Sequence, residues 1–251
     1  MNPNLPPNSN GSKPNLSSEK TTTNPIPDFA AGQVLLFDKP LEWTSFNVVA
    51  KVRNTLKTVV GKKLKVGHAG TLDPLATGLL ILCTGKMTKQ IETFQGQEKE
   101  YTGTFRLGEQ TPSYDGETEV SERKDIDHLS ENDILEATKP FTGWIEQHPP
   151  IFSAIKVKGK RAYESAREGK EIKLKSRSVE ISIFEITGIE LPDVHFRVVC
   201  SKGTYIRSLA HDFGQELGVG AYLTALRRTR IGEFSVTDAH QIEKWVEEIK
   251  G

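Results

Sequence analysis

The sequence predicts an α+β protein built around one large mixed or antiparallel sheet. Two long segments of alternating apolar residues, at 178–190 and 194–200, suit neighbouring antiparallel strands. Segments with helical spacing also occur, but they do not alternate regularly with the strands as a parallel α/β sheet requires. No internal repeat is visible, so the strands and helices are expected to share one fold.

Composition limits the class of protein. A chain of 251 residues and 27.9 kDa is long enough to bury a sizeable core. No apolar run approaches the roughly 18 residues that a membrane helix needs. The first residues lack the basic and apolar regions of a secretion signal, so we expect a cytoplasmic protein without a membrane partner. The two cysteines, Cys83 and Cys200, form no C-x-x-C pair, so we expect reduced core thiols.

The N-terminal third begins with a tail and continues with a strand and a helix. Residues 1–30 are rich in Pro and Asn and poor in apolar residues, which predicts a disordered tail. The run QVLLF from Gln33 predicts a short buried strand. Thr44 or Ser45 then caps a helix, whose apolar residues recur at helical spacing until Gly61 ends it.

The middle of the chain alternates short elements. The glycine-rich stretch 67–78 predicts a loop and is followed by the buried strand LLILC and a short helix at 87–94. Residues 99–107 alternate as a half-buried strand, and the acidic stretch up to His128 is expected to pair back onto it. Ser130, with Asp133 three residues later, caps a further helix that Lys139 and Pro140 end.

The last part returns to the sheet after an inserted lobe. The segment around 147–175 is basic and predicts an inserted strand and a short helix stopped by Gly169. After the paired strands, residues 201–218 predict a capped helix and residues 223–234 a strand. A final helix is expected from about Asp238.

Charge is balanced overall but unevenly distributed. The chain has 33 basic and 33 acidic residues, whereas segments 51–107, 154–178 and 197–230 carry net charges of +6, +6 and +4. Phosphate contacts with release of counterions supply most non-specific affinity for nucleic acid. The blocks are therefore consistent with a polyanionic partner, although ordinary solvated surface is the more common explanation of any single block.

The loop 67–78 is the first candidate for chemistry. A loop anchored between a helix and an apolar strand presents a reactive carboxylate such as Asp73 rigidly, although Asp before Pro is also common in surface turns. The stretch is not a phosphate-binding Walker loop, because the glycine needed five positions before Gly85 is Leu80. No G-x-G-x-x-G or G-x-S-x-G motif occurs, and the six histidines lack close metal-ligand spacing.

Three further segments combine aromatic and basic residues. Tyr101, beside Lys99, suits a stacking platform for a base or a core position. The stretch 201–207 at a helix start suits an anion, with Thr204 as a plain cap in the alternative interpretation. Arg228 and Arg230 alternate on a strand and could share one face, which more often decorates a surface than binds RNA.

Five ordered motifs resemble one family. They are LLFDKP with GHAGTLDPLATGLL, then KEYTGTFRLG, PPIFSAIKVKGKRAYESAREG, SKGTYIRSLAHDFG and LRRTRIG, and they run from about Val34 to Phe234. Together they are similar to the TruB family of bacterial tRNA pseudouridine(55) synthases. The resemblance implies the pseudouridine synthase fold and isomerisation of the T-arm loop uridine of tRNA. It implies no cofactor and no metal.

The resemblance also assigns roles to individual residues. Asp73 is the implied catalytic carboxylate, which either adds to the nucleotide or assists deprotonation at the sugar. Arg207 is implied to pair with Asp73, and Tyr101 to stack on the flipped uracil and help remove the C5 proton. The residues implied in substrate binding are His68, which supports the vacated base stack, Tyr205 and Leu226, which line the uracil pocket, and Lys39, which buttresses the catalytic loop.

The domain organisation follows from the same comparison. Residues 31–251 are expected to form one catalytic domain, with the basic insertion gripping the T-arm. Only 17 residues follow the motif RRTRIGEF, so no C-terminal PUA-like RNA-binding domain is expected. Phe152 stands where the family pattern has tyrosine. We expect a monomer that needs no protein partner.

Two other functions use the same features. An RNA-folding chaperone would bind tRNA through the basic segments and the aromatic platform without turnover. An isomerase acting on ribosomal or messenger RNA within a larger complex is a third hypothesis, although no partner-docking domain is evident in the sequence.

Overall fold

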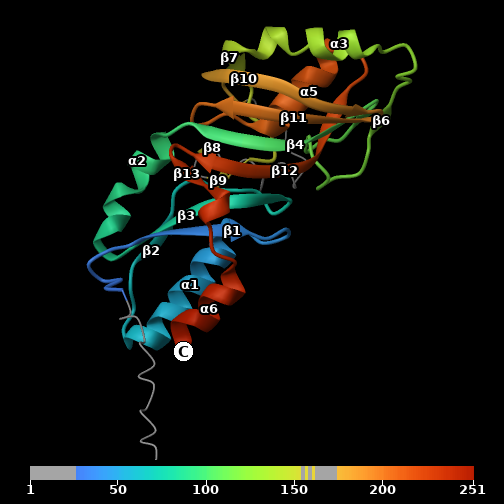
Figure 1. The fold of residues 1–251 in the computed structure, drawn as a ribbon. Coiled ribbons are helices and arrows are strands. Elements are labelled where there is room, and N and C mark those ends of the chain that lie inside the picture. The colour runs from blue at the N-terminus through green and yellow to red at the C-terminus, as the bar shows by residue number, and fades with distance from the viewer. Residues whose placement is uncertain (1–26, 154–155, 158–159, 162–173) are drawn as a thin grey trace, which may run out of the picture.

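The computed structural model describes residues 27–153, 156–157, 160–161 and 174–251. Within these ranges, one nine-stranded sheet dominates the fold, in the order β1-β3-β12-β4-β11-β10-β7, with β2 paired to β3 and β13 paired to β12 (Figure 1). All pairs are antiparallel except β12 with β3. The predicted α+β class with a large mixed sheet is therefore confirmed.

The elements have the following bounds. The strands of the main sheet are β1 (Val34–Lys39), β2 (Val66–His68), β3 (Ala76–Thr84), β4 (Lys99–Leu107), β7 (Gly143–Gln147), β10 (Arg177–Glu190), β11 (Asp193–Cys200), β12 (Ala221–Ile231) and β13 (Phe234–Ser235). Two small ladders pair β5 (Glu109–Gln110) with β6 (Glu122–Arg123) and β8 (Lys156–Val157) with β9 (Lys160–Arg161). The helices are α1 (Ser45–Val60), α2 (Ile91–Gly96), α3 (Glu131–Glu136), α5 (Ile206–Glu216) and α6 (Ile242–Lys250), with 3₁₀ turns η1 (Gly85–Gln90), η2 (Lys139–Phe141) and η3 (Val236–Asp238).

Helix α1 forms where local sequence specifies it. The Thr44 hydroxyl accepts a hydrogen bond from the Asn47 amide at 3.0 Å, and the Asn47 side chain accepts one from the Thr44 amide at 2.8 Å. Such a cap stabilises a helix by about 1 kcal/mol. Gly61 ends the helix at φ +73°, a left-handed conformation that glycine adopts without strain. Ser130 and Asp133 cap α3 in the same way, as predicted.

Strand β12 connects the two parts of the sheet. It lies between β3 and β4, pairing in parallel with the first and antiparallel with the second. Gly78 makes this approach possible, because a Cβ atom there would lie 2.3 Å from the carbonyl oxygen of Arg228. Its φ of +104° also excludes an ordinary side chain.

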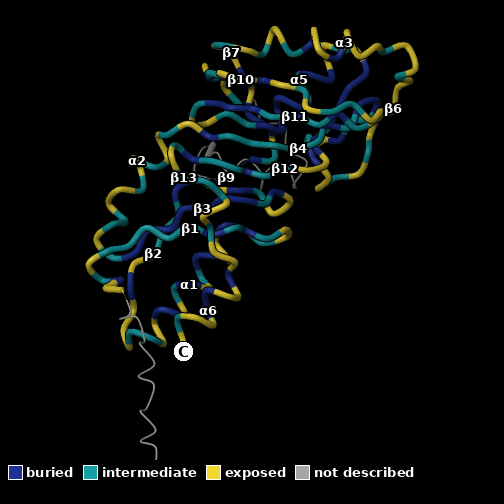
Figure 2. The backbone as a smooth tube through the Cα atoms, in the orientation of Figure 1, coloured by how far each residue is buried: buried dark blue, intermediate teal, exposed yellow. Residues whose placement is uncertain are grey.

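Two apolar clusters hold the helices against the sheet (Figure 2). Helices α1 and α6 pack beside β1, where Phe37 and Trp245 meet edge to face at 5.2 Å. Helix α5 packs on the other half through Phe213, which contacts Phe105 of β4. Helices α1 and α6 therefore cover one part of the sheet, and α5 covers another part.

Phe29 corrects the expected tail boundary. Its side chain is 2 % exposed and contacts Trp245 edge to face at 6.4 Å, so it belongs to the core. Composition averaged over residues 1–30 concealed this single buried anchor. Residues 1–26 of the expected tail lie outside the described residues, as does most of the predicted basic lobe, including its helix up to Gly169.

Other expectations need correction because strands pair with distant partners. The acidic stretch forms β6, which pairs with β5, since β12 and β11 already occupy both edges of β4. The final helix begins at Ile242, and Asp238 lies in η3.

Both cysteines are free and buried as predicted. Burial raises the pKa of Cys83 to about 11 and that of Cys200 to about 12. No helix in the described part of the chain is long and apolar enough to cross a membrane.

Candidate active site

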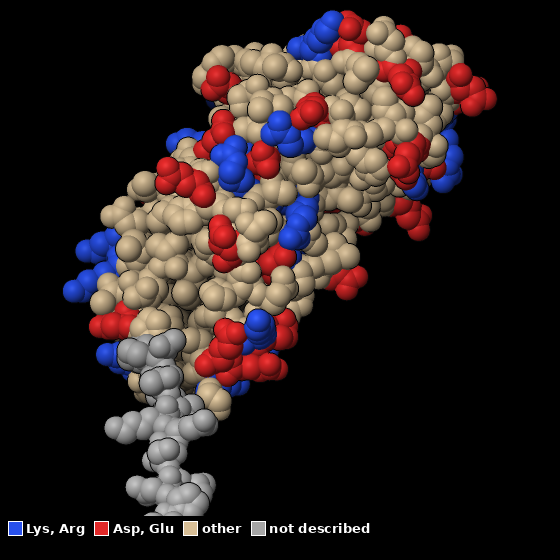
Figure 3. All heavy atoms as spheres, viewed as in Figure 1, with Lys and Arg blue, Asp and Glu red and all other residues tan. Residues whose placement is uncertain are grey.

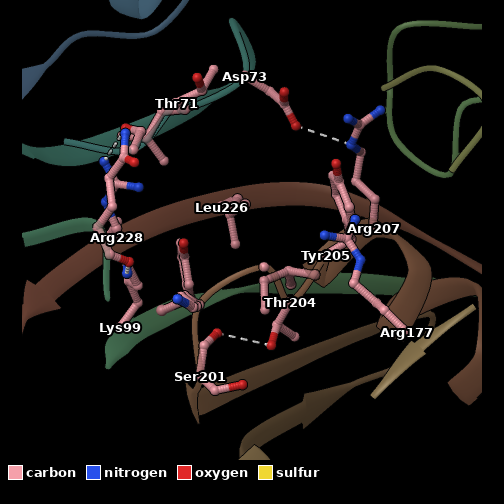
Figure 4. Close-up of a pocket in the computed structure, with 17 residues that line it drawn as sticks. Thr71, Asp73, Lys99, Arg177, Ser201, Thr204, Tyr205, Arg207, Leu226 and Arg228 are labelled. Carbon is pink, nitrogen blue, oxygen red and sulfur yellow. Dashed lines mark hydrogen bonds and ion pairs between the residues drawn. The ribbon is translucent and has the colours of Figure 1, made fainter. Parts of the chain in front are cut away.

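A cavity of about 520 Å³ lies where the loop before β3, strands β4 and β12 and the start of α5 meet (Figure 4). Five of the seven predicted site residues line it: Asp73, Tyr101, Tyr205, Arg207 and Leu226. Lys39 and His68 do not line it. The residues that close the rest of the wall include Lys99, Arg177 and Arg228. The fold therefore brings together side chains from five separate segments of the chain.

The loop that carries Asp73 is fixed from several sides. The Leu72 amide donates to the Ser45 hydroxyl at 2.8 Å, and the Ala76 amide donates to the Asp73 carbonyl at 3.1 Å. The Lys39 ammonium donates to the carbonyls of Pro40, Trp43 and Pro74 at 2.8, 2.6 and 3.3 Å. Because Pro74 follows Asp73 directly, Lys39 holds the loop from behind the cavity.

The Lys39 side chain is fully buried, and this burial changes the pKa of its amine. Burial lowers the pKa of its amine to about 8, and the nearby Asp73 carboxylate opposes this shift. Three carbonyl oxygens satisfy the three N–H donors of the ammonium, so the buried cation is fully hydrogen-bonded. The structure thus places Lys39 where it supports the loop and does not contact a ligand in the cavity.

Asp73 faces a buried cation. Nε of Arg207 lies 3.0 Å from Oδ2 of Asp73, in an ion pair whose angle does not fit a hydrogen bond (Figure 4). The Arg207 side chain is 5 % exposed and that of Asp73 is 41 % exposed. The cation is therefore anchored in the protein, and the carboxylate reaches into the cavity beside it.

A second carboxylate contacts the same guanidinium. Nη1 of Arg207 lies 3.5 Å from Oδ2 of Asp115 and donates to the carbonyl of Ser113 at 3.4 Å. Burial raises the pKa of Asp115, and Arg207 opposes that shift. Arg207 therefore bridges Asp73 and Asp115. Sequence reasoning missed Asp115, whose only signal was its place in the turn TPSYDGE.

Tyr101 and Arg228 form the wall on the β4 and β12 side. Tyr101 is half-buried, and burial raises the pKa of its phenol while the neighbouring Arg228 opposes the shift. Arg228 is 1 % exposed and donates to the carbonyls of Leu79 at 2.8 Å and Gly70 at 3.1 Å. It therefore ties β12 to β3 and to the loop of Asp73.

The expected surface row of Arg228 and Arg230 is wrong. A register irregularity in β12 separates the two residues, so the simple alternation of a strand does not apply. Arg228 is buried, whereas Arg230 pairs with Glu98 at 3.1 Å at the surface. Sequence periodicity alone does not reveal a bulge of this kind.

Tyr205 is positioned through its backbone. Its amide donates to the Gln147 side chain at 2.8 Å, and the Gln147 amide group donates to the Tyr205 carbonyl at 3.0 Å. Tyr205 is the N-cap residue of α5, and Thr204 donates instead to the Ser201 carbonyl at 3.0 Å. The interpretation of Thr204 as the cap is therefore wrong, and the buried Gln147 of β7 takes that positioning role.

Arg177 is a cation that sequence reasoning did not single out. Its guanidinium carbon lies 4.5 Å from the centre of the Tyr205 ring. Its Nη2 atom is buried and has no hydrogen-bond partner among the described residues. A buried, unpaired guanidinium N–H is costly unless a ligand accepts from it. Arg177 also lines the cavity, so its guanidinium adds a cation that suits an anionic group.

His68 lies on β2, two residues before Gly70, which is part of the cavity wall. Its ring is half-buried, its Nδ1 atom has no hydrogen-bond partner among the described residues, and burial lowers the pKa of the ring.

Lys99, like Lys39, has a buried amine. It donates to the carbonyls of Gln95 and Gln97, each at 2.5 Å. Burial lowers the pKa of Lys99 to about 8.

The basic blocks do not give a uniformly basic surface on the face shown in Figure 3. On the face shown in Figure 3, Lys and Arg lie among Asp and Glu, and blue side chains also project along the edge beside α2. Arg197 illustrates the mixture, since it contacts Glu100 and Glu185 at 3.0 Å each. No group of three or more His, Cys, Asp or Glu residues in the described ranges could hold a metal ion.

Comparison with known proteins identifies the class. The family model described as TruB family pseudouridylate synthase (N-terminal domain) matches residues 57–206. The model described as tRNA pseudouridylate synthase B C-terminal domain matches residues 207–250. These two segments share the single sheet described above, because the second supplies β12. The fold is therefore that of a pseudouridine synthase.

Individual relatives agree with these matches. Proteins named tRNA pseudouridine synthase B from Flavobacterium johnsoniae and Chloroherpeton thalassium are each 56 % identical to this chain. The matches cover 89 % and 87 % of this chain and 98 % and 90 % of the relatives. The chain belongs to the TruB family.

Solved structures show the same fold. The crystal structure of a Cbf5-Nop10-Gar1 complex contains a chain that is 32 % identical, with a TM-score of 0.66 over 87 % of this chain. A structure of an H/ACA RNP bound to a substrate RNA containing 2'-deoxyuridine gives 30 % identity and a TM-score of 0.62 over 85 %. This chain covers 54 % and 52 % of those two proteins, about half of their length.

Proposed function

We propose that this chain isomerises uridine 55, in the T-arm loop of tRNA, to pseudouridine, with Asp73 as the catalytic carboxylate. The observation that carries the proposal is the ion pair of Asp73 with the buried Arg207 at the wall of a cavity with two tyrosines. Membership of the TruB family and the relatives named tRNA pseudouridine synthase B support it.

The reaction conserves every atom of the uracil. The N1–C1′ glycosidic bond breaks, C5 bonds to C1′, and the proton lost from C5 is balanced by a proton gained at N1. Positive charge develops on the sugar as the base departs, and a fixed carboxylate lowers that barrier. Asp73 either adds to the nucleotide or assists deprotonation at the sugar. Arg207 holds the carboxylate in a fixed position in both cases.

The reacting base must leave its stack to enter the cavity. We propose that Tyr101 stacks on the flipped uracil and that Tyr205 and Leu226 line its pocket, because all three side chains face the same space as Asp73. His68 lies next to the cavity wall, which suits support of the stack that the target nucleotide vacates. Tyr101 assists removal of the C5 proton.

Arg177 binds the RNA in this proposal. Its guanidinium lines the cavity against the Tyr205 ring, a position that suits a phosphate group of the bound strand. Lys39 acts indirectly through its hydrogen bond to the Pro74 carbonyl. The basic insertion around 147–175 grips the T-arm, and most of that segment lies outside the described residues.

The enzyme acts on tRNA as a monomer in the cytoplasm, without a protein partner, cofactor or metal. Residues 31–251 form the catalytic domain, and Phe29 also belongs to its core. The alternative function as a folding chaperone without turnover is not favoured, because binding alone does not require a carboxylate held against a buried arginine in a cavity.

The test is direct formation of pseudouridine. The purified protein is incubated with an unmodified tRNA transcript, and pseudouridine is mapped by carbodiimide-dependent stops of primer extension. A new stop at the T-loop uridine is expected with the wild-type chain, and none with Asp73→Asn, although this variant still binds tRNA. Tight binding without a stop in the wild type would overturn the proposal and favour the chaperone function. A transcript with cytidine at the target position is the matched control.

A further inference from the structure

The loop that carries Asp115 makes a second contact with helix α5. The ring of Tyr114 stacks on the ring of His211, with centroids 4.0 Å apart and planes inclined by 14°. Both residues are half-buried, and neither belongs to the apolar clusters that form the described core. The stack therefore needs an explanation other than general core packing.

The Tyr114–His211 contact and the Asp115–Arg207 contact lie next to each other along α5. His211 follows Arg207 by four residues on α5, so both side chains lie on one face of the helix, one turn apart. Tyr114 directly precedes Asp115. Two adjacent loop residues thus contact two adjacent residues of one helix face: Asp115 meets Arg207, and Tyr114 meets His211.

The backbone of the loop is held in an unusual conformation. Tyr114 has a φ of +63°, which residues other than glycine rarely adopt. The carbonyl of Asp115 accepts hydrogen bonds from the hydroxyls of Thr111 at 2.7 Å and Ser113 at 3.1 Å. The Tyr114 carbonyl accepts from the Leu223 amide of β12 at 3.0 Å. The strained turn makes the side chains of residues 114 and 115 both face α5.

We infer that Tyr114 and His211 are positioning residues for the isomerisation. Their stack holds the loop so that Asp115 contacts Arg207, and Asp115 in turn sets the direction in which Arg207 meets Asp73. The chain of contacts runs from a ring stack outside the cavity to the catalytic carboxylate inside it. This inference rests on the proposed function.

Two variants distinguish the effect of the Tyr114 ring from the effect of its backbone conformation. Tyr114→Gly removes the ring but adopts the positive φ freely, so the turn itself is not disfavoured. Tyr114→Phe keeps a ring of the same shape. We expect the single-turnover rate of Tyr114→Gly to fall about tenfold or more, as misplacement of a catalytic group does. We expect Tyr114→Phe to restore the rate and tRNA affinity to stay unchanged in both variants.

His211 supplies an independent check should Tyr114→Gly fold poorly. His211→Ala is expected to lower the rate as Tyr114→Gly does, and His211→Phe to restore it by keeping a stacking ring. Thermal melting of each variant establishes that the protein is folded at the assay temperature. The rate is measured as tritium release from C5 of labelled uridine in tRNA, with enzyme in excess.

A double-mutant cycle tests whether the stack acts through Asp115. In an Asp115→Asn background, Tyr114→Gly is expected to cause little further fall in rate, because the two changes remove one pathway. Equal falls in both backgrounds would overturn the inference, as would a wild-type rate in Tyr114→Gly. A wild-type enzyme without turnover would instead overturn the proposed function and the inference that rests on it.

Discussion

Nε of Arg207 lies 3.0 Å from Oδ2 of Asp73, and this ion pair joins the start of α5 to the loop before β3. The buried member is the arginine, whereas the carboxylate is exposed to the cavity. Because Arg207 also contacts Asp115, its orientation is set from the protein side. The carboxylate to which we assign the chemistry is thus held by a buried guanidinium.

Replacement of Arg207 by lysine tests this arrangement. The substitution keeps the charge, but a single ammonium cannot reproduce the planar contacts of a guanidinium with two carboxylates. We expect Arg207→Lys to lower the single-turnover rate by about 100-fold, the size of loss seen when one preorganised group is removed. Arg106→Lys is the matched control, because Arg106 makes a two-point pair with Asp193 outside the cavity. Equal rates in the two variants would contradict the assigned role.

Arg177 provides a prediction about binding. If its guanidinium contacts a phosphate, Arg177→Gln removes one counterion-releasing contact. We expect the slope of log affinity for tRNA against log salt concentration to become shallower by about 1. Lys244→Gln serves as the control, because Lys244 is an exposed residue of α6. Affinities measured by filter binding at several salt concentrations give the slope, and an unchanged slope in Arg177→Gln would disprove the phosphate contact.

Lys39 predicts an alkaline limit to activity. Its folded-state pKa is lowered to about 8, so the amine loses its proton in the folded protein as pH rises through 8. A neutral amine has only two N–H donors for the three carbonyls, which loosens the loop of Asp73. We expect the maximal rate to decline above about pH 8.

Lys99 has a similar pKa of about 8, so variants are needed to show which of the two lysines causes the fall in rate at high pH. Lys39→Arg stays protonated throughout and is expected to remove the alkaline limb of the rate profile, whereas Lys99→Arg is expected to keep it. The measurement is the single-turnover rate from about pH 6 to about 9.5, a range that spans this pKa. Persistence of the limb in an active Lys39→Arg enzyme would assign it to another group.

Asp212 predicts a dependence of stability on pH. Burial raises its pKa to about 6, and His148 opposes the shift. The folded state therefore holds this proton at pH values where the unfolded state has released it, so the contribution to stability falls as pH rises from about 4 to 6 and stays lost above. Because the carboxyl is only partly buried, we expect about 1 kcal/mol.

Asp212→Asn should remove that loss. At about pH 7.5 we expect its Tm to exceed that of the wild type by about 2–4 °C, the shift that 1 kcal/mol produces in a domain of this size. At about pH 4 the two melting temperatures should coincide, because both side chains are neutral in the folded protein. A difference independent of pH would mean that hydrogen bonding, and not ionisation, distinguishes the two side chains.

Local sequence was sufficient for elements with local causes. Thr44 and Gly61 set the two ends of α1 through contacts within a few residues. The alternation of apolar and polar residues in 99–107 identifies β4. Partners far apart in the chain were not predictable in this way. The position of β12 between β3 and β4 depends on Gly78, whose missing Cβ matters only once Arg228 lies against it.

The same limit applies to the candidate site. The motifs located the cavity residues Asp73, Tyr101 and Arg207, because the resemblance to a family carries their positions. Asp115 and Arg177 were missed, since each acquires its role from the partner that folding supplies, a guanidinium for the first and a tyrosine ring for the second.

The central position of β12 has a consequence for synthesis of the protein. Strands β1 and β3 leave the ribosome early, and β4 leaves later, but β12, which joins them edge to edge, ends only at Ile231. A nascent chain therefore exposes the unpaired edges of β3 and β4 until most of the protein has been made. Such edges associate readily with other chains. The nascent chain is thus most vulnerable to aggregation just before β12 emerges.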